Sequence, residues 1–233
     1  MHPIDKAARV AGALYLLAIV VGPFSLIYIP TVLFVSGDAT ATAHNVLTHE
    51  MLFRLGIVGD LLAGVSILFL TLALYQLLKG VDRGYAFLMV ILGGLMVTPI
   101  FFLNALNWVA ALLLVHGADF LAAFTQAQRY ALAMLFIRLH SQGNVVDEMF
   151  WGLWLFPFGI LVARSRFLPR LLGVWLIVGG LGYLALSLAG LLFPQYEDIV
   201  FTVVQPAFLG EIAIMLWLLI KGANVRVLTA SAP

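Results

Sequence analysis

Asp60, Glu211 and Asn104 are the residues best placed for chemistry, because each lies deep within a long apolar run. At about 1.5 Å per residue, helices would place them roughly 13, 18 and 16 Å below the outer membrane surface. A carboxyl group buried in hydrocarbon holds its proton more readily than one in water, so Asp60 and Glu211 are candidate acid and base catalysts. The alternative is structural: a protonated or paired carboxyl group that holds helices together.

A second polar group recurs at intervals of four, three, four and three residues, which places its members on one stripe of a helix. They are His140, Asn144, Asp147, Trp151 and Trp154, with Glu148 beside the stripe. Counting back from an inner end near Ala163 puts Asp147 about 6 Å under the outer surface and His140 at or above it. We therefore interpret His140, Asn144, Asp147, Glu148 and Trp151 as candidate substrate-binding residues, together with Asn104. Simple placement at the membrane interface is the alternative.

Arg54 completes the candidate substrate-binding set, in the first turns of the second apolar run. Glu50 precedes it by four residues and is its natural ion-pair partner. Arg54 and Asp60 are six residues apart, about 120° around a helix, so they cannot pair along one face. Arg54 must extend outward or reach another helix.

Other reaction classes lack the residues that they need. The chain has no cysteine, so thiolate metal sites, disulfides and thiol nucleophiles are excluded. His44 and His49 are five residues apart in an expected outer loop, which is not a helical metal-ligand spacing, and we expect no metal. Neither a second haem ligand within a span nor a serine-hydrolase elbow motif is evident.

The composition indicates the surroundings that must position these residues. Hydrophobic residues make up 64% of the 233 residues, charged residues 10%, and the mean hydropathy is +1.10. A soluble domain of this size could not bury so much apolar surface. We predict a single transmembrane helical domain over residues 1–233, crossing the membrane six times. The predicted spans are approximately 10–29, 51–78, 85–115, 145–163, 171–193 and 199–220.

Loop charges predict the orientation. Nine basic residues fall in the expected inner segments, against Arg129 and Arg138 in the outer ones, which places both termini in the cytoplasm. The nine are Lys6, Arg9, Lys79, Arg83, Arg164, Arg166, Arg170, Lys221 and Arg226. The fold class is therefore all-α integral membrane: a six-transmembrane-helix bundle with both termini cytoplasmic and short amphipathic helices on the outer side.

Two outer segments and several small or rigid residues refine this prediction. Asp38 is expected to cap a helix that ends at Thr48, and Thr125 with Gln128 forms a capping-box pattern that opens a separate interfacial helix, Gln126–His140.

Four prolines lie inside spans and are expected to kink them. They are Pro23, Pro99, Pro157 and Pro206. Two glycine pairs indicate close helix packing rather than phosphate loops. They are Gly93-Gly94 and Gly179-Gly180.

Several short strings resemble a bacterial multi-pass inner-membrane family catalogued as domain of unknown function four-three-eight-six. They are Phe53 to Asp60, Gly117 to Asp119, Phe136 to His140, Phe167 to Val174, Gly179 to Tyr183, Gly210 to Ile212 and Leu216 to Gly222. The resemblance extends from about Ala7 to Gly222. It implies a bacterial inner-membrane helical bundle, and it adds no substrate and no catalytic residue.

Three functions fit these features. The first is binding or conversion of a lipophilic small molecule in an outward-facing polar cavity, using the intramembrane carboxylates, with aromatic rings flanking a cationic or isoprenoid species. The second is a proton- or ion-coupled permease. The third is a non-catalytic subunit or assembly factor. Expected partners are membrane lipids, a lipophilic small molecule, and a second copy of the chain or another membrane chain. A net charge of +1 gives no reason to expect nucleic acid, and no cofactor is indicated.

Overall fold

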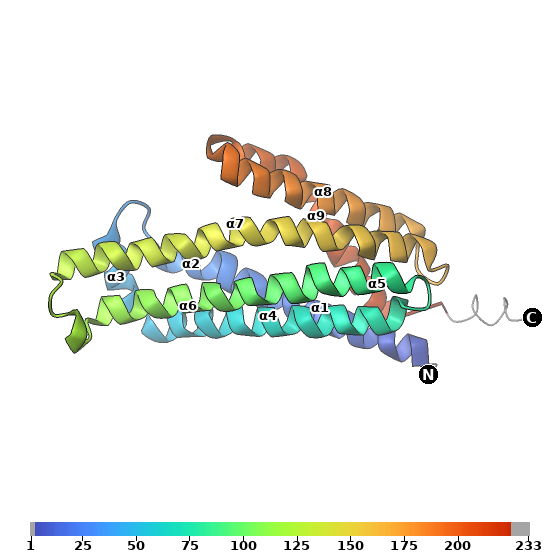
Figure 1. The fold of residues 1–233 in the computed structure, drawn as a ribbon, viewed down its shortest axis with the longest axis horizontal. Coiled ribbons are helices and arrows are strands. Elements are labelled where there is room, and N and C mark those ends of the chain that lie inside the picture. Colours follow the sequence, from blue (N-terminus) through green and yellow to red (C-terminus); the bar gives the residue numbers. More distant parts are fainter. Residues whose placement is uncertain (1–2, 225–233) are drawn as a thin grey trace, which may run out of the picture. The chain divides into compact units, whose positions relative to one another are not determined.

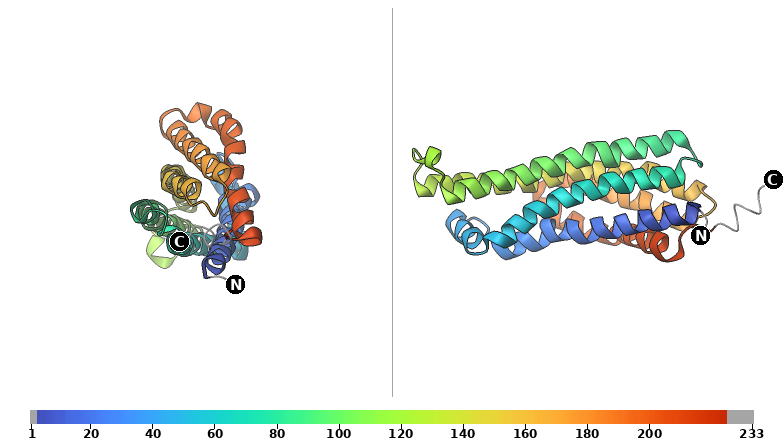
Figure 2. Two further views of the ribbon diagram at one scale, coloured as in Figure 1. Left: turned by 90° about the vertical axis from the view of Figure 1, so that its right-hand side faces the viewer. Right: turned by 90° about the horizontal axis from the view of Figure 1, so that it is seen from below.

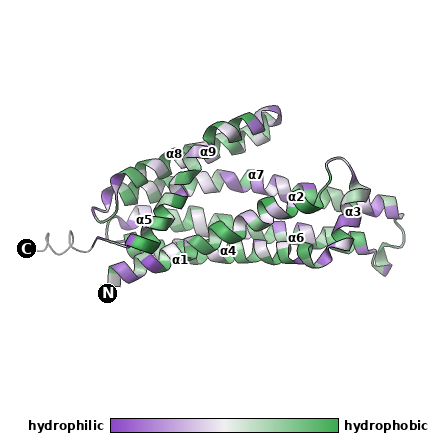
Figure 3. Ribbon diagram, turned by 180° about the vertical axis from the view of Figure 1, so that it is seen from behind, coloured by the Kyte–Doolittle hydropathy of each residue, from purple (hydrophilic) through white to green (hydrophobic). Residues whose placement is uncertain are grey.

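The computed structural model describes residues 3–224, and every regular element within that range is a helix (Figure 1). Six stretches of this part of the chain are long and apolar enough to cross a membrane, as predicted. They are Ile4–Leu33, Glu50–Leu78, Arg83–His116, Gln126–Arg164, Arg170–Leu192 and Pro194–Lys221. Hydrophobic residues cover most of their length, whereas hydrophilic residues gather near the connections (Figure 3). Arg226, one of the nine basic residues above, lies outside the described residues.

Three of the six stretches are single helices: α4 (Glu50–Leu78), α7 (Gln126–Arg164) and α8 (Arg170–Leu192). The other three change helix type along their length. The first joins α1 (Pro3–Pro23), the π-helical segment Phe24–Tyr28 and α2 (Ile29–Leu33); the third joins α5 (Arg83–Met89), the π-helical segment Val90–Met96 and α6 (Val97–His116). The sixth joins a 3-10 turn (Pro194–Tyr196), α9 (Glu197–Leu216) and the π-helical segment Trp217–Lys221. Between spans lie α3 (Ala39–Thr48) and a 3-10 turn, Asp119–Leu121.

The two predicted helix caps are confirmed. Asp38 Oδ1 accepts a hydrogen bond from the Ala41 backbone N–H at 2.8 Å, so that α3 begins at Ala39 and ends at Thr48. At the start of α7, Thr125 Oγ1 accepts from the Gln128 N–H at 3.3 Å, and Gln128 Oε1 accepts from the Thr125 N–H at 2.9 Å. Both caps satisfy backbone donors that the first turn of a helix leaves free.

The prediction of a separate interfacial helix at Gln126–His140 is wrong. α7 runs without a break for 39 residues (Figure 1). At about 1.5 Å per residue, it is about 58 Å long, roughly twice the thickness of the hydrocarbon core. Two polar side chains just after His140 have partners within the continuous helix or on a neighbouring one. Ser141 donates to the Ile137 carbonyl one turn earlier, and Asn144 pairs with Asn104 of α6.

The four prolines predicted to kink their spans differ in their surroundings. Pro23 directly precedes the π-helical segment of the first span, and Pro99 follows that of the third span by three residues. A proline cannot donate the hydrogen bond of a regular helix, and a change of helical register beside it accommodates the missing donor. Pro157 and Pro206 lie within α7 and α9, which remain helical through them.

The chain divides into two compact units, each of which we describe by itself. Unit 2 consists of Val20–Gly64 and Pro99–Asn144, and unit 1 contains the remainder. The described residues of unit 1 are 3–19, 65–98 and 145–224. All four boundaries fall inside helices, so no linker separates the units. A single domain over the whole chain stays a prediction.

In unit 1 the backbones of α7 and α8 approach each other closely, because glycines lie at their contact. A Cβ atom on Gly152 of α7 would lie 2.7 Å from the Gly180 carbonyl oxygen of α8, and one on Gly159 would lie 2.5 Å from that of Gly173. The predicted close packing at Gly179-Gly180 is thus confirmed, and small residues serve this purpose widely in membranes. α8 and α9 also lie side by side (Figures 1 and 2).

Unit 2 is organised around Trp108 of α6, which is completely buried. Its ring packs against Phe53 of α4, with centroids 5.2 Å apart, and against Phe34, with centroids 5.8 Å apart. Gly56 makes room for it, because a Cβ atom there would lie 2.6 Å from the Trp108 ring. This aromatic core holds α4 and α6 in place beside the first half of α7.

Candidate functional site

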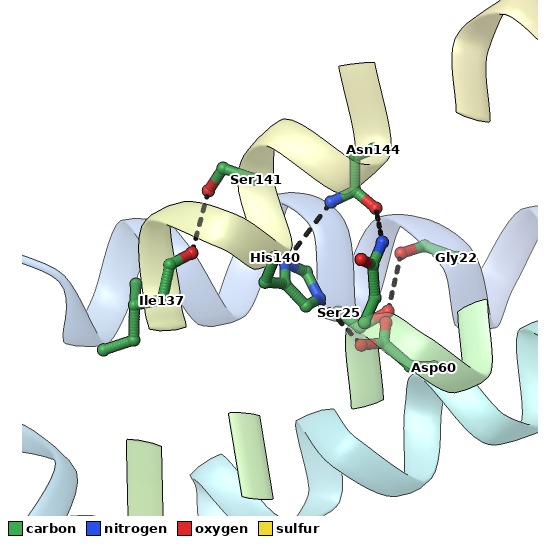
Figure 4. Close-up of polar contacts among 8 residues, drawn as sticks. Gly22, Ser25, Asp60, Ile137, His140, Ser141 and Asn144 are labelled. Carbon is green, nitrogen blue, oxygen red and sulfur yellow. Dashed lines mark hydrogen bonds and ion pairs between the residues drawn. The ribbon is translucent and has the colours of Figure 1, made fainter. Parts of the chain in front are cut away.

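A buried carboxyl–imidazole pair lies at the centre of unit 2. Asp60 of α4 and His140 of α7 are each 1% exposed, and Asp60 Oδ2 lies 2.7 Å from His140 Nε2 (Figure 4). The depth counts made from the sequence placed Asp60 well inside the membrane and His140 at or above its surface, and both cannot be right. The count for His140 placed the inner membrane surface near Ala163, at the end of α7. Because α7 has 39 residues and is longer than one crossing, its end need not coincide with that surface.

Two asparagines extend this pair into a network of four side chains. Asn104 Nδ2 donates to Asn144 Oδ1 at 2.6 Å, and Asn144 Nδ2 lies 3.4 Å from His140 Nδ1 (Figure 4). With the Asn144 oxygen turned to Asn104, its amide N–H donates to Nδ1 of His140. The imidazole proton then lies on Nε2 and is donated to Asp60. We call Asp60, Asn104, His140 and Asn144 the Asp60 network. Its hydrogen bonds form a chain in which each residue donates to the next, from Asn104 through Asn144 and His140 to Asp60.

Trp108 and Ser25 pack around the Asp60 network. The Trp108 ring stacks on the His140 imidazole, with centroids 4.0 Å apart and planes at 14°. Ser25 is buried, donates to the Gly22 carbonyl at 3.2 Å (Figure 4), and lies against α4 at Gly59, the residue before Asp60. The imidazole is therefore held both by hydrogen bonds and by a fixed aromatic face.

Two buried polar atoms of this region have no hydrogen-bond partner in the protein: Asp60 Oδ1, an acceptor, and Trp108 Nε1, a donor. Both belong to side chains that touch His140. Buried polar atoms are normally satisfied, by water where protein groups do not reach them. Asp60 Oδ1 can therefore accept one further hydrogen bond, and Trp108 Nε1 can donate one.

Unit 1 contains the second candidate carboxyl group, Glu211 of α9. Tyr15 of α1 donates to its Oε2 at 2.5 Å, and Tyr183 of α8 is a second hydrogen-bond partner. Neither tyrosine was predicted, because a tyrosine in a span is most often an interface or core residue. Glu211 is half-buried, in contrast to Asp60. Each of the two candidate catalytic residues thus has polar partners within its own unit.

Asp147 and Glu148 of α7 also lie in unit 1. Asp147 is completely buried, and neither of its oxygens makes a hydrogen bond of normal geometry, although the Trp151 side chain one turn later interacts with it. Glu148 Oε2 also has no hydrogen-bond partner, and Glu148 interacts electrostatically with Glu197 at the start of α9. The predicted stripe of α7 therefore supplies His140 and Asn144 to unit 2, and Asp147 and Trp151 to unit 1.

Arg54 does not join the Asp60 network. Its Nε donates to Glu50 Oε1 at 2.7 Å, as the four-residue spacing predicted, and its side chain is 53% exposed. His116 Nε2 also lies 3.1 Å from Glu50. His44 and His49 are exposed, and no three His, Cys, Asp or Glu side chains within residues 3–224 are grouped to hold a metal ion.

The comparison with known families gives one match. The family model described as domain of unknown function (DUF4386) matches residues 10–222, which is most of the chain. No curated protein and no solved structure matches the sequence. The match assigns no activity to any residue, so a function must be argued from the geometry of the two units.

Proposed function

The chain belongs to the DUF4386 family, whose function is unknown, and we propose that it binds or converts a lipophilic small molecule through the Asp60 network. Asp60 is the group that contacts the molecule and gives or takes a proton. His140 is a positioning residue, because its Nε2–H holds the carboxyl group in one orientation. The apolar spans around the network select for a molecule that partitions into the membrane.

The observation that carries this proposal is the unsatisfied Oδ1 of Asp60, beside an Oδ2 that is firmly held. Leaving a buried acceptor without a partner costs about 1–3 kcal/mol. A hydroxyl or amine group that donates to Oδ1 recovers this free energy, and the Trp108 indole N–H offers a donor to the same molecule. Because the pair is buried, such a donor is held without competition from bulk water.

The orientation and the location belong to the same proposal. The excess of basic residues in the expected inner segments supports cytoplasmic termini, and with that orientation the proposed cavity opens outward. The resemblance described above supports a place in a bacterial inner membrane. An even number of crossings agrees with this arrangement. Membrane lipids, or molecules dissolved among them, would then reach the Asp60 network from the outer leaflet.

A proton-coupled permease is the second candidate, and the π-helical segments favour it. Phe24–Tyr28 and Val90–Met96 interrupt two spans, and such interruptions recur at functional sites and in transporters. In this case Asp60 and His140 would carry the coupled proton. Transport assays in proteoliposomes distinguish the two functions, with the candidate solutes supplied outside the vesicles. Uptake driven by a pH gradient supports the permease, and binding without such uptake supports the first proposal.

Native mass spectrometry of the gently extracted protein tests the proposal. We expect a defined lipid or isoprenoid adduct on the wild-type protein that is lost in Asp60→Asn, which keeps the shape and the hydrogen bond to His140. Glu50→Gln is the matched control, because it removes a carboxyl group from the exposed start of the same helix and should keep the adduct.

Retention of the adduct in Asp60→Asn would refute the proposed role of Asp60. Absence of any adduct from all three proteins, with a lower unfolding temperature only in Asp60→Asn, would show that the network merely holds helices together. That outcome would favour a non-catalytic subunit or assembly factor.

A further inference from the structure

The Glu211 carboxyl group of unit 1 has two hydroxyl partners and no cationic one. Tyr15 and Tyr183 bond to it, and no Lys, Arg or His within residues 3–224 forms an ion pair with it. Hydroxyl donors orient a carboxylate but do not neutralise its charge. This carboxyl group is therefore held in place, and the described residues supply no counter-charge for it when it ionises.

Aromatic rings pack against both tyrosines that bond to this carboxyl group. Around Tyr15 the rings are buried: Tyr15 packs against Trp154 and Phe158, whose rings stack 5.3 Å apart. Around Tyr183 the rings are half-buried: Tyr183 stacks on Phe208 with centroids 4.1 Å apart, and Trp151 meets Tyr183 edge to face at 5.7 Å. We call Trp151, Tyr183 and Phe208 the front layer. The front layer is accessible to a molecule in the bilayer, and aromatic faces attract cations.

Two further carboxyl groups lie beside the front layer. Asp147, completely buried and without a hydrogen bond of normal geometry, interacts with the Trp151 side chain. Glu148, which has one unpartnered oxygen, interacts electrostatically with Tyr183. This second, independent observation agrees with the first: the groups around Trp151 and Tyr183 are acidic, and no Lys, Arg or His within residues 3–224 forms an ion pair with them.

We propose that Glu211 and the rings of Trp151, Tyr183 and Phe208 form a binding site for a lipophilic organic cation, such as an ammonium or phosphonium group that carries apolar substituents. The carboxylate supplies the counter-charge, the ring faces add cation–π attraction, and the apolar substituents remain in lipid. In this site Trp151 of α7, Tyr183 of α8 and Phe208 of α9 contact the same cation as Glu211. The site is independent of the proposed role of Asp60, because all of its residues belong to unit 1.

Tetraphenylphosphonium is a suitable probe, because it is permanently charged, apolar and soluble. Titration of the purified full-length protein in detergent, read by quenching of tryptophan fluorescence and by calorimetry, should show saturable binding. Glu211→Gln should weaken binding at least tenfold, whereas Glu211→Asp, which keeps the charge, should retain most of it. Asp198→Asn is the matched control, because it removes a carboxyl group from an exposed position at the start of the same helix, and it should change the affinity less than twofold.

Three results would overturn the inference: no saturable binding to the wild-type protein, equal affinity in Glu211→Gln, or equal affinity for the neutral analogue triphenylphosphine oxide. Trp151→Leu provides a second test should Glu211→Gln fail to fold, since it leaves the Tyr15–Glu211 bond intact. Trp151→Leu should weaken binding of the cation severalfold, and an unchanged affinity would contradict the proposed role of the front layer. None of these expectations depends on the role proposed for Asp60. They stand even if native mass spectrometry finds no adduct at Asp60.

Discussion

Breaking the bond between Asp60 and His140 should lower the free energy of unfolding by a measurable amount. Both side chains are 1% exposed, and the bond is 2.7 Å long. Hydrogen bonds to charged groups contribute about 1.5–3 kcal/mol in soluble proteins. In membranes, measured couplings average about 0.6 kcal/mol and reach about 1.7, because the unfolded chain also finds partners. We therefore expect a coupling free energy of about 1–2 kcal/mol between Asp60→Ala and His140→Ala.

A double-mutant cycle measures this coupling directly. The wild-type protein, the two single variants and the double variant are unfolded by a denaturing detergent, and the non-additive part of the free energy of unfolding is extracted. The matched control is the cycle of Glu50→Ala and Arg54→Ala, a pair of similar distance whose side chains are 32% and 53% exposed. Exposed pairs contribute little, so the control should show no coupling above error. Equal coupling free energies in the two cycles would refute our reasoning that burial strengthens the Asp60–His140 bond.

Two further predictions concern packing and orientation. Gly152→Ala should lower the unfolding temperature, because its methyl group would lie 2.7 Å from a backbone oxygen of α8, whereas Gly80→Ala, with nothing within 4 Å, should not. Identical unfolding of the two variants would show that α7 and α8 do not approach so closely. Single cysteines report orientation cleanly, since the sequence contains none. A membrane-impermeant maleimide should label Asp38→Cys in intact cells and Lys79→Cys only after lysis, and the opposite pattern would reverse the proposed topology.

Local patterns in the sequence predicted much of the fold. Apolar runs indicated six spans, Asp38 marked the start of α3, and the four-residue spacing of Glu50 and Arg54 indicated their ion pair. Each of these features depends on residues within a few turns of one another. Hydropathy and spacing report such local relations well, because they reflect a single helix in contact with lipid or water.

The candidate sites depend on relations that a single sequence does not contain. Asp60 and His140 are 80 residues apart, and Tyr15 and Glu211 are 196 residues apart. Depth along a helix follows from counting residues, but the rotation of each helix about its axis depends on the packing of side chains between helices. The early part of α7 was also misjudged: the capping box at Thr125 predicted a separate helix over Gln126–His140, whereas α7 continues to Arg164.

Nitrogen-15 NMR of the histidine side chains tests the central claim most directly. The spectrum of the five imidazoles is recorded before and after addition of a lipid extract from the membranes that yield the protein, with His140→Asn used for assignment. We predict that His140 carries its proton on Nε2 and that its signals shift on addition, while those of the exposed His44 and His49 do not. A His140 signal that does not respond to any lipid fraction, or a proton on Nδ1 alone, would contradict a ligand at the Asp60 network.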